Sequence, residues 1–311
     1  MEIILEKGMA RVTILLLNYN RPNDTNECIN SLRGIESPEY NILLLDNNSP
    51  DNSFEIFQNK FPDLEIINTG SNLGYTGGIN FGLKILAARN SDYILVLNND
   101  TIVEPDFLEH LVDSMEENKL AAAACGTILC EHNREEIWYA GGAMVEWRGL
   151  AVHNGKGKKF TEYIKVHSPQ KTSFVTGCSI LFRRSILTKI GFEDERFYMY
   201  LDDIEYSKRI KKLGFELLYV PRSIIYHKVL GEKDSPFKLY YSVRNRYLLI
   251  KSSFQGTNYV IANLYFSIVI FLKIVYWKFR NPIFFKAAIA GLQDYRKKNF
   301  GKGRGHEFFN I

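Results

Sequence analysis

Short apolar runs alternate with amphipathic segments over the first 130 residues of the chain. An unbroken apolar run of strand length is typical of a strand buried on both faces of a parallel sheet, whereas apolar residues at helical spacing indicate a covering helix. We expect strands at 11–18, 41–45, 64–67, 93–97 and 121–129. We expect helices at 24–32, 54–61, 78–88 and 104–118. This order predicts an α/β fold with a mostly parallel sheet flanked by helices.

The alternation ends after residue 129, and the next hundred residues give a less regular pattern. Residues 149–168 are polar and rich in Gly and Lys, which predicts a flexible flap. The other expected elements are short strands or a hairpin at 137–147, a strand at 174–182 interrupted by Thr176 and Gly177, and a strand pair at 215–226 that ends at His227. A glycine within a strand marks either the close approach of a ligand or a bulge.

Residues 251–311 form a distinct, basic region. The apolar residues of 259–272 follow helical spacing, but this run is shorter than the roughly 20 residues that a membrane span requires. Residues 273–304 carry nine Lys or Arg against Asp294 alone, a net charge of +8 that would be attracted to anionic lipid. We expect this region to lie on a membrane surface; the alternative is a helix packed on residues 1–250, followed by a solvated tail.

Composition narrows the class of protein. The 311 residues are 46% hydrophobic and 24% charged, as in globular proteins, and a formal charge of +4 gives no reason to expect a nucleic-acid partner. The four cysteines form neither a C-x-x-C pair nor a disulfide framework, which favours a reducing, cytoplasmic setting. The first residues do not show the pattern of a secretory signal.

Polar side chains follow each of the first four predicted strands. These are Asn18, Asp46, Asn72 and the run Asn98-Asn99-Asp100. Parallel strands joined by right-handed crossovers place their carboxyl ends on one edge of the sheet, where ligands bind. Oxygen atoms of Asn98 and Asp100 suit Mg²⁺ or Mn²⁺, although such a loop can also form ordinary turn hydrogen bonds.

A glycine-rich loop at 72–80 precedes the third predicted helix. Its glycines would let backbone amides approach a phosphate at the helix N-terminus. The loop matches neither G-x-G-x-x-G nor a P-loop, so a dehydrogenase or a P-loop enzyme fits poorly. The alternative is a flexible turn.

Three carboxylates, Asp202, Asp203 and Glu205, lie between an aromatic run and a basic helix. One aspartate could cap that helix, but two adjacent aspartates behind so apolar a run suggest a raised pKa, which suits a general base. His227, taken alone, is more often structural than a metal ligand.

Together these motifs resemble glycosyltransferase family 2, inverting enzymes of the GT-A fold, and within it the rhamnosyltransferase and galactofuranosyltransferase branch. The resemblance covers about residues 11–250, leaving 251–311 as a C-terminal helical extension. It implies that Asp203 is the catalytic base, with Asp202 in a positioning or capping role. It also implies that Asn98, Asp100 and His227 hold a divalent metal, with Asn98 in the first place of the D-x-D motif.

The resemblance further implies which residues contact the substrates. The donor contacts are Asn18, Asn20, Arg21, Asp46, Asn72, Gly74, Gly77, Gly78, Asn98, Asn99 and, from a Y-Y-x-x-R-N-R segment, Arg244. The acceptor contacts are Thr176, Gly177 and Glu205.

The function implied is metal-dependent transfer of a sugar, rhamnose-like by resemblance, from a nucleoside-diphosphate sugar to a glycan or lipid-linked glycan on the cytoplasmic face of the membrane. The alternatives are a nucleotidyltransferase acting on sugar phosphates and a non-catalytic, membrane-associated module that binds nucleotide sugars. The sequence leaves the donor sugar, the acceptor, the metal and the oligomeric state open.

Overall fold

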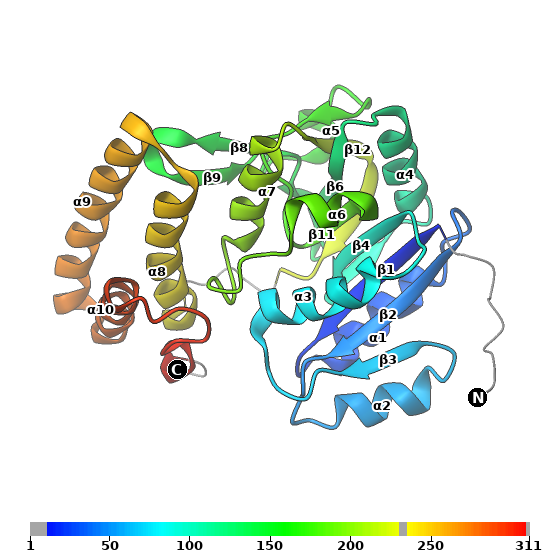
Figure 1. Ribbon diagram of the computed structural model, residues 1–311, viewed down its shortest axis with the longest axis horizontal. Coiled ribbons are helices and arrows are strands. Elements are labelled where there is room, and N and C mark those ends of the chain that lie inside the picture. Colours follow the sequence, from blue (N-terminus) through cyan, green and yellow to red (C-terminus); the bar gives the residue numbers. More distant parts are fainter. Residues whose placement is uncertain (1–10, 230–234, 309–311) are drawn as a thin grey trace.

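A computed structural model describes residues 11–229 and 235–308 of the chain. It contains a ten-stranded mixed sheet flanked by helices, with a layer of C-terminal helices beside it (Figure 1). The strands of this sheet are β1 (Val12–Asn18), β2 (Tyr40–Asp46), β3 (Glu65–Asn68), β4 (Tyr93–Asn98), β5 (Thr101–Val103), β6 (Ala121–Cys130), β7 (Asn133–Tyr139), β10 (Gln170–Lys171), β11 (Ser179–Arg183) and β12 (Glu216–His227). The structure therefore confirms the predicted α/β class.

Four parallel strands form the first half of the sheet, in the order β3-β2-β1-β4. Helices α1 (Pro22–Leu32), α2 (Ser53–Lys60) and α3 (Gly74–Ala87) connect these strands, whereas α4 (Phe107–Glu117) packs on β12 and β6 of the other half. The register pairs Asn18 with Asp46 and Asp46 with Asn68, so the polar strand ends meet at one edge. The predicted convergence at this edge is confirmed.

The second half of the sheet mixes strand directions. Strand β11 is antiparallel to both β4 and β6, and β12 runs parallel to β6 and antiparallel to the short strand β5. The last pairing places His227 opposite Thr101, next to Asp100. The pairing of β12 with β5 thus brings the candidate metal ligands Asp100 and His227, which are far apart in sequence, into direct contact.

Three local predictions need correction. The strand pair expected at 215–226 is the single strand β12. The polar segment 149–168 is not one flexible flap, because it includes β9 (Leu150–His153), which pairs with β8 (Gly142–Val145), and the short helix α5 (Phe160–Tyr163). The expected strand at 174–182 begins only at Ser179, so Thr176 and Gly177 precede it. The remaining short elements are η1 (Glu146–Arg148), α6 (Arg184–Ile190) and α7 (Asp202–Lys212).

The C-terminal layer consists of α8 (Pro236–Ser253), α9 (Gly256–Arg280), α10 (Pro282–Lys297) and η2 (Gly305–Phe308). The domain boundary predicted at residue 250 falls inside α8, near its end. Helix α10 packs on α8, and α9 forms the outer edge of the layer (Figure 1). The C-terminal region is therefore joined to the catalytic part by a continuous helix.

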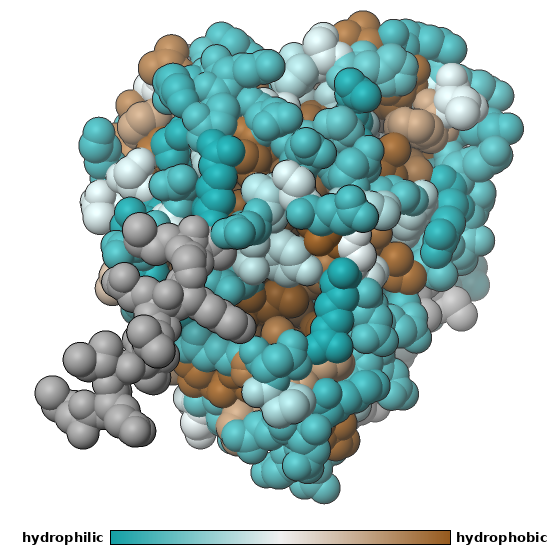
Figure 2. All heavy atoms as spheres, turned by 90° about the vertical axis from the view of Figure 1, so that its right-hand side faces the viewer, coloured by the Kyte–Doolittle hydropathy of each residue, from teal (hydrophilic) through white to brown (hydrophobic). Residues whose placement is uncertain are grey.

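Helix α9 is longer than the predicted apolar run. Its 25 residues are long and apolar enough to cross a membrane by length and composition alone. Its buried residues are Ala262, Phe266 and Ile270, and apolar residues such as Leu264, Phe271 and Phe279 are exposed. The opposite end of the molecule is mostly hydrophilic, with apolar residues in a central hollow and scattered among the polar ones (Figure 2).

Candidate active site

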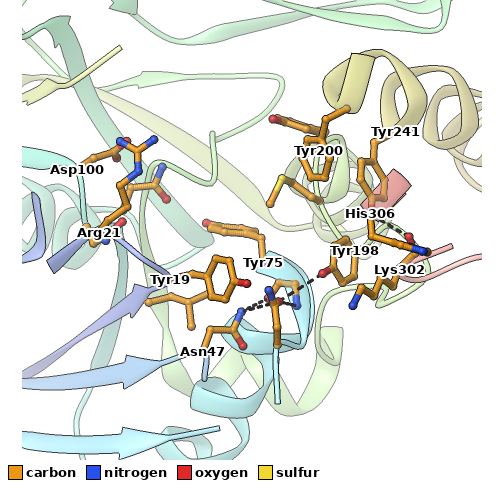
Figure 3. Close-up of a pocket in the computed structure, with 17 residues that line it drawn as sticks. Tyr19, Arg21, Asn47, Tyr75, Asp100, Tyr198, Tyr200, Tyr241, Lys302 and His306 are labelled. Atoms are coloured by element: carbon orange, nitrogen blue, oxygen red, sulfur yellow. Dashed lines mark hydrogen bonds between the residues drawn. The ribbon is translucent and has the colours of Figure 1, made fainter. Parts of the chain in front are cut away.

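A cavity of about 610 Å³ opens at the carboxyl edge of the parallel strands. Asp100 and Arg21 lie at one end, Lys302 and His306 at the other, and Tyr75 between them (Figure 3). The first end comes from strand ends of the sheet, and the second comes from the C-terminal layer. The cavity thus joins two parts of the chain that are far apart in sequence.

Asp100 and His227 form the most unusual pair at the first end. The His227 Nε2 lies 3.1 Å from the Asp100 Oδ1, and Trp138 meets the imidazole edge to face at 4.8 Å. Within residues 11–229 and 235–308, the Asp100 Oδ1 and the His227 Nδ1 are buried without a hydrogen-bond partner. Such orphaned atoms are costly unless something else satisfies them.

A divalent metal fits this pair. Asn98, which lines the same end of the cavity, adds an amide oxygen. The described residues contain no cluster of three or more His, Cys, Asp or Glu side chains that could hold a metal without help. Mg²⁺-type sites commonly take only one or two carboxylates from the protein and fill the remaining positions with substrate phosphates and water. The residues present therefore suit a metal that arrives with a diphosphate.

Asn18 and Asp46 lie beneath the cavity. Both side chains are fully buried, and the Asn18 Nδ2 donates to the Asp46 Oδ1 at 2.8 Å. Thr25 donates to the Asn18 Oδ1, and Asn99 donates to Thr25 at 2.7 Å. The predicted direct donor contacts of Asn18 and Asp46 are corrected to a supporting role. Their sequence neighbours Tyr19 and Asn47 line the cavity instead, and the prediction missed both.

The glycine-rich loop divides into two parts. Gly74 begins helix α3 with a φ of +74° and lines the cavity together with Asn72, whose Oδ1 accepts from the Gly74 amide at 2.9 Å. Gly77 and Gly78 lie inside α3, and a Cβ on Gly78 would stand 2.7 Å from the Leu17 side chain. Gly78 therefore permits packing of the helix on β1, a Cβ on Gly77 would meet Leu73 at 3.0 Å, and neither glycine lines the cavity.

Asn20 and Arg21 were predicted together but have different positions. Arg21 lines the cavity and forms an ion pair with Asp24 at 3.2 Å. Asn20 is exposed, has a φ of +56° and does not line the cavity. Asn99 and Asn98 both line it, as predicted.

The two aspartates of α7 differ in exposure. Asp202 is 3% exposed, whereas Asp203 is partly accessible. The Asp203 Oδ2 accepts from the Gly177 amide at 3.0 Å, and its Oδ1 accepts from the Ile204 amide at 2.9 Å. Burial raises the pKa of both carboxyl groups, and the charge of Asp203 adds to the effect on Asp202. The phenol of Tyr75 donates to the Gly177 carbonyl at 2.6 Å, which connects Asp203 to the cavity wall.

The predicted acceptor residues separate in the structure. Thr176 and Gly177 both hydrogen-bond to Asp203. Glu205 is paired with Arg209 at 2.9 Å and lines a second pocket with Lys208, away from Thr176 and Gly177, so its acceptor contact stays a prediction.

Backbone strain is concentrated just before the aspartates. Tyr198, Tyr200 and Leu201 have φ values of +65°, +67° and +67°, a region that non-glycine residues rarely adopt. Arg244 is fully buried and donates to the carbonyls of Phe197 and Gly301. Its predicted donor contact is therefore corrected: Arg244 holds the loop that lines the cavity.

The sequence prediction missed the contribution of residues 301–308. Lys302 and His306 line the cavity, although Lys302 and Arg304 were counted as membrane-facing charges. Arg304 instead pairs with the buried Asp294 at 3.0 Å. The sequence pattern that could have indicated a packed segment here is the alternation of Gly301, Gly303 and Gly305. A Cβ on Gly303 or Gly305 would collide with Tyr240 or Tyr241, respectively.

A family model described as Glycosyl transferase family 2 matches residues 13–191. The N-acetylglucosaminyl-diphospho-decaprenol L-rhamnosyltransferase of Mycobacterium tuberculosis is 24% identical over 211 residues, covering 63% of this chain and 69% of that protein. The low-salt glycan biosynthesis hexosyltransferase Agl10 of Haloferax volcanii is 22% identical over 259 residues, covering 78% of this chain and 76% of that protein.

Two solved structures share the fold. A mannosyltransferase of Pyrobaculum calidifontis in complex with GDP-Man and Mn²⁺ is 14% identical, has a TM-score of 0.54 and covers 94% of this chain and 76% of its own. GalNAc-T7 with UDP, GalNAc and Mn²⁺ is 17% identical, has a TM-score of 0.62 and covers 98% of this chain and 57% of its own. At these identities the likeness establishes the architecture, which is that of GT-A glycosyltransferases.

Proposed function

This chain belongs to glycosyltransferase family 2, and we propose that it is an inverting, metal-dependent transferase that moves a rhamnose-like sugar from a nucleoside-diphosphate donor to a glycan or lipid-linked glycan. The observation that carries this proposal is the Asp100–His227 pair, with Asp100 lining a cavity whose wall connects to Asp203. The rhamnosyl donor and the lipid-linked acceptor are supported by the activity for which the mycobacterial relative is named.

The proposed reaction is a single displacement at the anomeric carbon. Asp203 takes the proton of the acceptor hydroxyl, and the hydroxyl oxygen forms a bond to the anomeric carbon. The bond from that carbon to the diphosphate oxygen breaks, and its electron pair leaves with the nucleoside diphosphate. Asp100, Asn98 and His227 would hold a divalent cation, Mn²⁺ or Mg²⁺, whose charge offsets that of the leaving group.

The surroundings of the Asp203 carboxylate support its role as a base. Its two oxygens accept from backbone amides, which fixes the carboxylate while leaving it partly accessible. The raised pKa makes the carboxylate a stronger proton acceptor than an ordinary aspartate. Asp202 is buried at the first turn of α7 and suits a positioning role.

The test is a ligand and turnover screen on the wild-type protein. We expect UDP, dTDP or GDP with Mn²⁺ to raise the melting temperature, and the matching nucleotide sugar to be hydrolysed slowly without acceptor. A nucleotidyltransferase would instead release diphosphate from a nucleoside triphosphate and a sugar phosphate. Stabilisation without any turnover would indicate a binding module and overturn the proposal.

We further propose that α9 lies on the cytoplasmic face of a membrane. One side of this helix packs within the C-terminal layer through Ala262, Phe266 and Ile270, and the other side exposes large apolar residues. Lys273, Lys278 and Lys286 are exposed nearby and suit anionic headgroups. A helix held by its neighbours on one side is better placed to lie along a bilayer than to cross it.

A further inference from the structure

The end of the cavity opposite Asp100 has no role in the transfer described above. It is built from the loop carrying Tyr198 and Tyr200, from Tyr241 of α8, and from Lys302 and His306 (Figure 3). Tyr75 stands between this end and Asp100. The two ends therefore offer separate binding regions, one with the metal ligands and one with aromatic rings and cations.

The segment that carries Lys302 and His306 is fixed by buried contacts. Arg244 donates to the Gly301 carbonyl at 2.6 Å, and Tyr241 donates to the Lys302 carbonyl at 2.8 Å. Arg304 pairs with Asp294, whose carboxylate also accepts from the Tyr240 phenol at 2.6 Å. Separating the buried Asp294 from Arg304 would strongly destabilise the protein. These contacts therefore hold the segment, and with it Lys302 and His306, at the cavity.

Both side chains remain available to a ligand. Lys302 and His306 are exposed, and no carboxylate among the described residues forms an ion pair with the Lys302 ammonium. Glu307 is the adjacent acidic residue; it is exposed and does not line the cavity. An ammonium and an imidazole N–H at one end of a cavity suit a phosphate, to which they can donate charge-assisted hydrogen bonds.

The neighbouring aromatic rings suit a sugar. Tyr198 and Tyr241 are stacked, with ring centroids 5.5 Å apart and planes 15° from parallel. Tyr241 is fully buried and supports Tyr198 from behind, whereas Tyr198 is partly accessible and Tyr200 is exposed. The rings of Tyr198 and Tyr200 can therefore contact the C–H and O–H groups of a pyranose. The strained backbone at Tyr198 and Tyr200 presents these rings directly before the Asp202–Asp203 pair.

We propose that this end is the acceptor subsite, and that Lys302 and His306 hold a phosphate or diphosphate attached to the acceptor sugar, while Tyr198 and Tyr200 contact the sugar itself. The assignment rests on the proposed glycosyl transfer. It explains why one cavity has two places for anionic groups: the donor diphosphate belongs at Asp100, and the acceptor phosphate belongs at Lys302.

The test measures binding by calorimetry with four probes. These are pyrophosphate, N-acetylglucosamine 1-phosphate, an N-acetylglucosaminyl diphosphate carrying a short alkyl chain, and octyl N-acetylglucosaminide, which has no phosphate. Metal-free protein is used, so that phosphate cannot bind through a cation. We expect the three phosphate-bearing probes to bind and Lys302→Ala to weaken each roughly 10-fold, as the loss of a charge-assisted hydrogen bond implies. The octyl glycoside should be unaffected by the substitution.

Lys297→Ala is the matched control, because Lys297 is an exposed lysine of α10 outside the cavity. An equal loss of affinity in Lys302→Ala and Lys297→Ala would indicate a general charge effect and overturn the subsite. Binding of the phosphate probes that does not change in Lys302→Ala would overturn it as well. Weaker binding of a nucleoside diphosphate with Mn²⁺ in Lys302→Ala would place this residue in the donor half and also overturn it. Preference for the alkyl diphosphate over the soluble sugar phosphate would identify a lipid-linked source.

The same titrations separate this inference from the proposed function. If UDP, dTDP and GDP with Mn²⁺ all fail to bind while the phosphate probes still depend on Lys302, the donor assignment fails and the phosphate subsite stands. If a nucleoside diphosphate binds and the phosphate probes show no dependence on Lys302, the subsite fails and the donor assignment stands.

Discussion

The side-chain amide nitrogen of Asn245 lies 2.7 Å from the carbonyl oxygen of Met199. The same nitrogen also donates toward the carbonyls of Phe197 and Tyr200, at 2.9 and 3.0 Å. One buried amide thus holds the loop in which Tyr198 and Tyr200 adopt left-handed backbone angles. Because this loop leads directly into Asp202 and Asp203, the position of the proposed base depends on a helix of the C-terminal layer.

We expect Asn245→Ala to reduce both stability and turnover. The substitution leaves buried carbonyl groups without their donor, which costs about 1–3 kcal/mol, and frees the loop that positions Asp203. Thermal unfolding and the rate of donor turnover measure the two effects. Ser252→Ala, at the exposed end of the same helix, should behave as wild type. An Asn245→Ala protein with unchanged stability and rate would contradict the role given to this amide.

Asp100→Ala should abolish turnover while the fold is retained. Asp100 is the only carboxylate of its motif, and its buried Oδ1 lacks a hydrogen-bond partner among the described residues. Added Mn²⁺ should therefore no longer strengthen the binding of a nucleoside diphosphate, which calorimetry can measure. Activity that persists with the same dependence on Mn²⁺ or Mg²⁺ would show that the metal is held elsewhere.

Asp203→Asn should lower kcat on the order of 10²–10⁴-fold and leave donor binding nearly unchanged, because the amide keeps the shape of the carboxylate but cannot accept the proton. Asp202→Asn should cost less, since Asp202 is buried and has a positioning role. Single-turnover kinetics with saturating donor compares the two. A larger loss of kcat in Asp202→Asn than in Asp203→Asn would mean that Asp202 is the base and Asp203 the positioning residue.

The rate of transfer should fall as the pH decreases through the pKa of Asp203. Burial raises that pKa, and the base acts only when deprotonated, so the acidic limb should lie above the ordinary aspartate value of about 3.9. A profile of kcat/KM against pH locates the limb, and binding of a nucleoside diphosphate over the same range serves as the control. A rate that stays constant down to pH 4 would contradict a base with a raised pKa.

The full chain should float with anionic liposomes, and high salt should weaken the association. Replacing Leu264, Phe271 and Leu272 of α9 by Gln should leave the protein unbound, because all three are exposed apolar residues. Ile56→Gln, an exposed apolar residue of α2, is the control. If the full chain does not bind liposomes, α9 has a purely structural role. If alkaline carbonate does not release the bound chain, α9 spans the membrane.

The strands and helices of the first 130 residues could be predicted because their pattern is local. Leu15, Leu44 and Leu95 lie in unbroken apolar runs and are fully buried, as such runs predict. Residues 149–168 were harder, since Leu150–His153 forms a strand only through its pairing with Gly142–Val145. A polar composition carries no signal of that tertiary pairing.

The candidate site was predictable where polar residues directly follow the end of a predicted strand. Asp100, Arg21, Asn72 and Gly74 line the cavity as expected. Asn18 and Asp46 show the limit, because two polar side chains in register satisfy each other and leave the surface to their neighbours. Lys302 was missed because its position depends on the buried Asp294–Arg304 pair, whereas counting charges treats all lysines of this region alike.

The cavity joins residues near position 20 to residues beyond position 300, and this separation has a consequence for synthesis of the protein. The parallel strands β1 to β4 can assemble once the first hundred residues have left the ribosome. Lys302 and His306 emerge last of the lining residues, so the second wall forms only after α8 and α10 have packed. We expect a chain cut between Ser253 and Gly301 to retain the nucleotide side of the cavity and to lack the side that would select an acceptor.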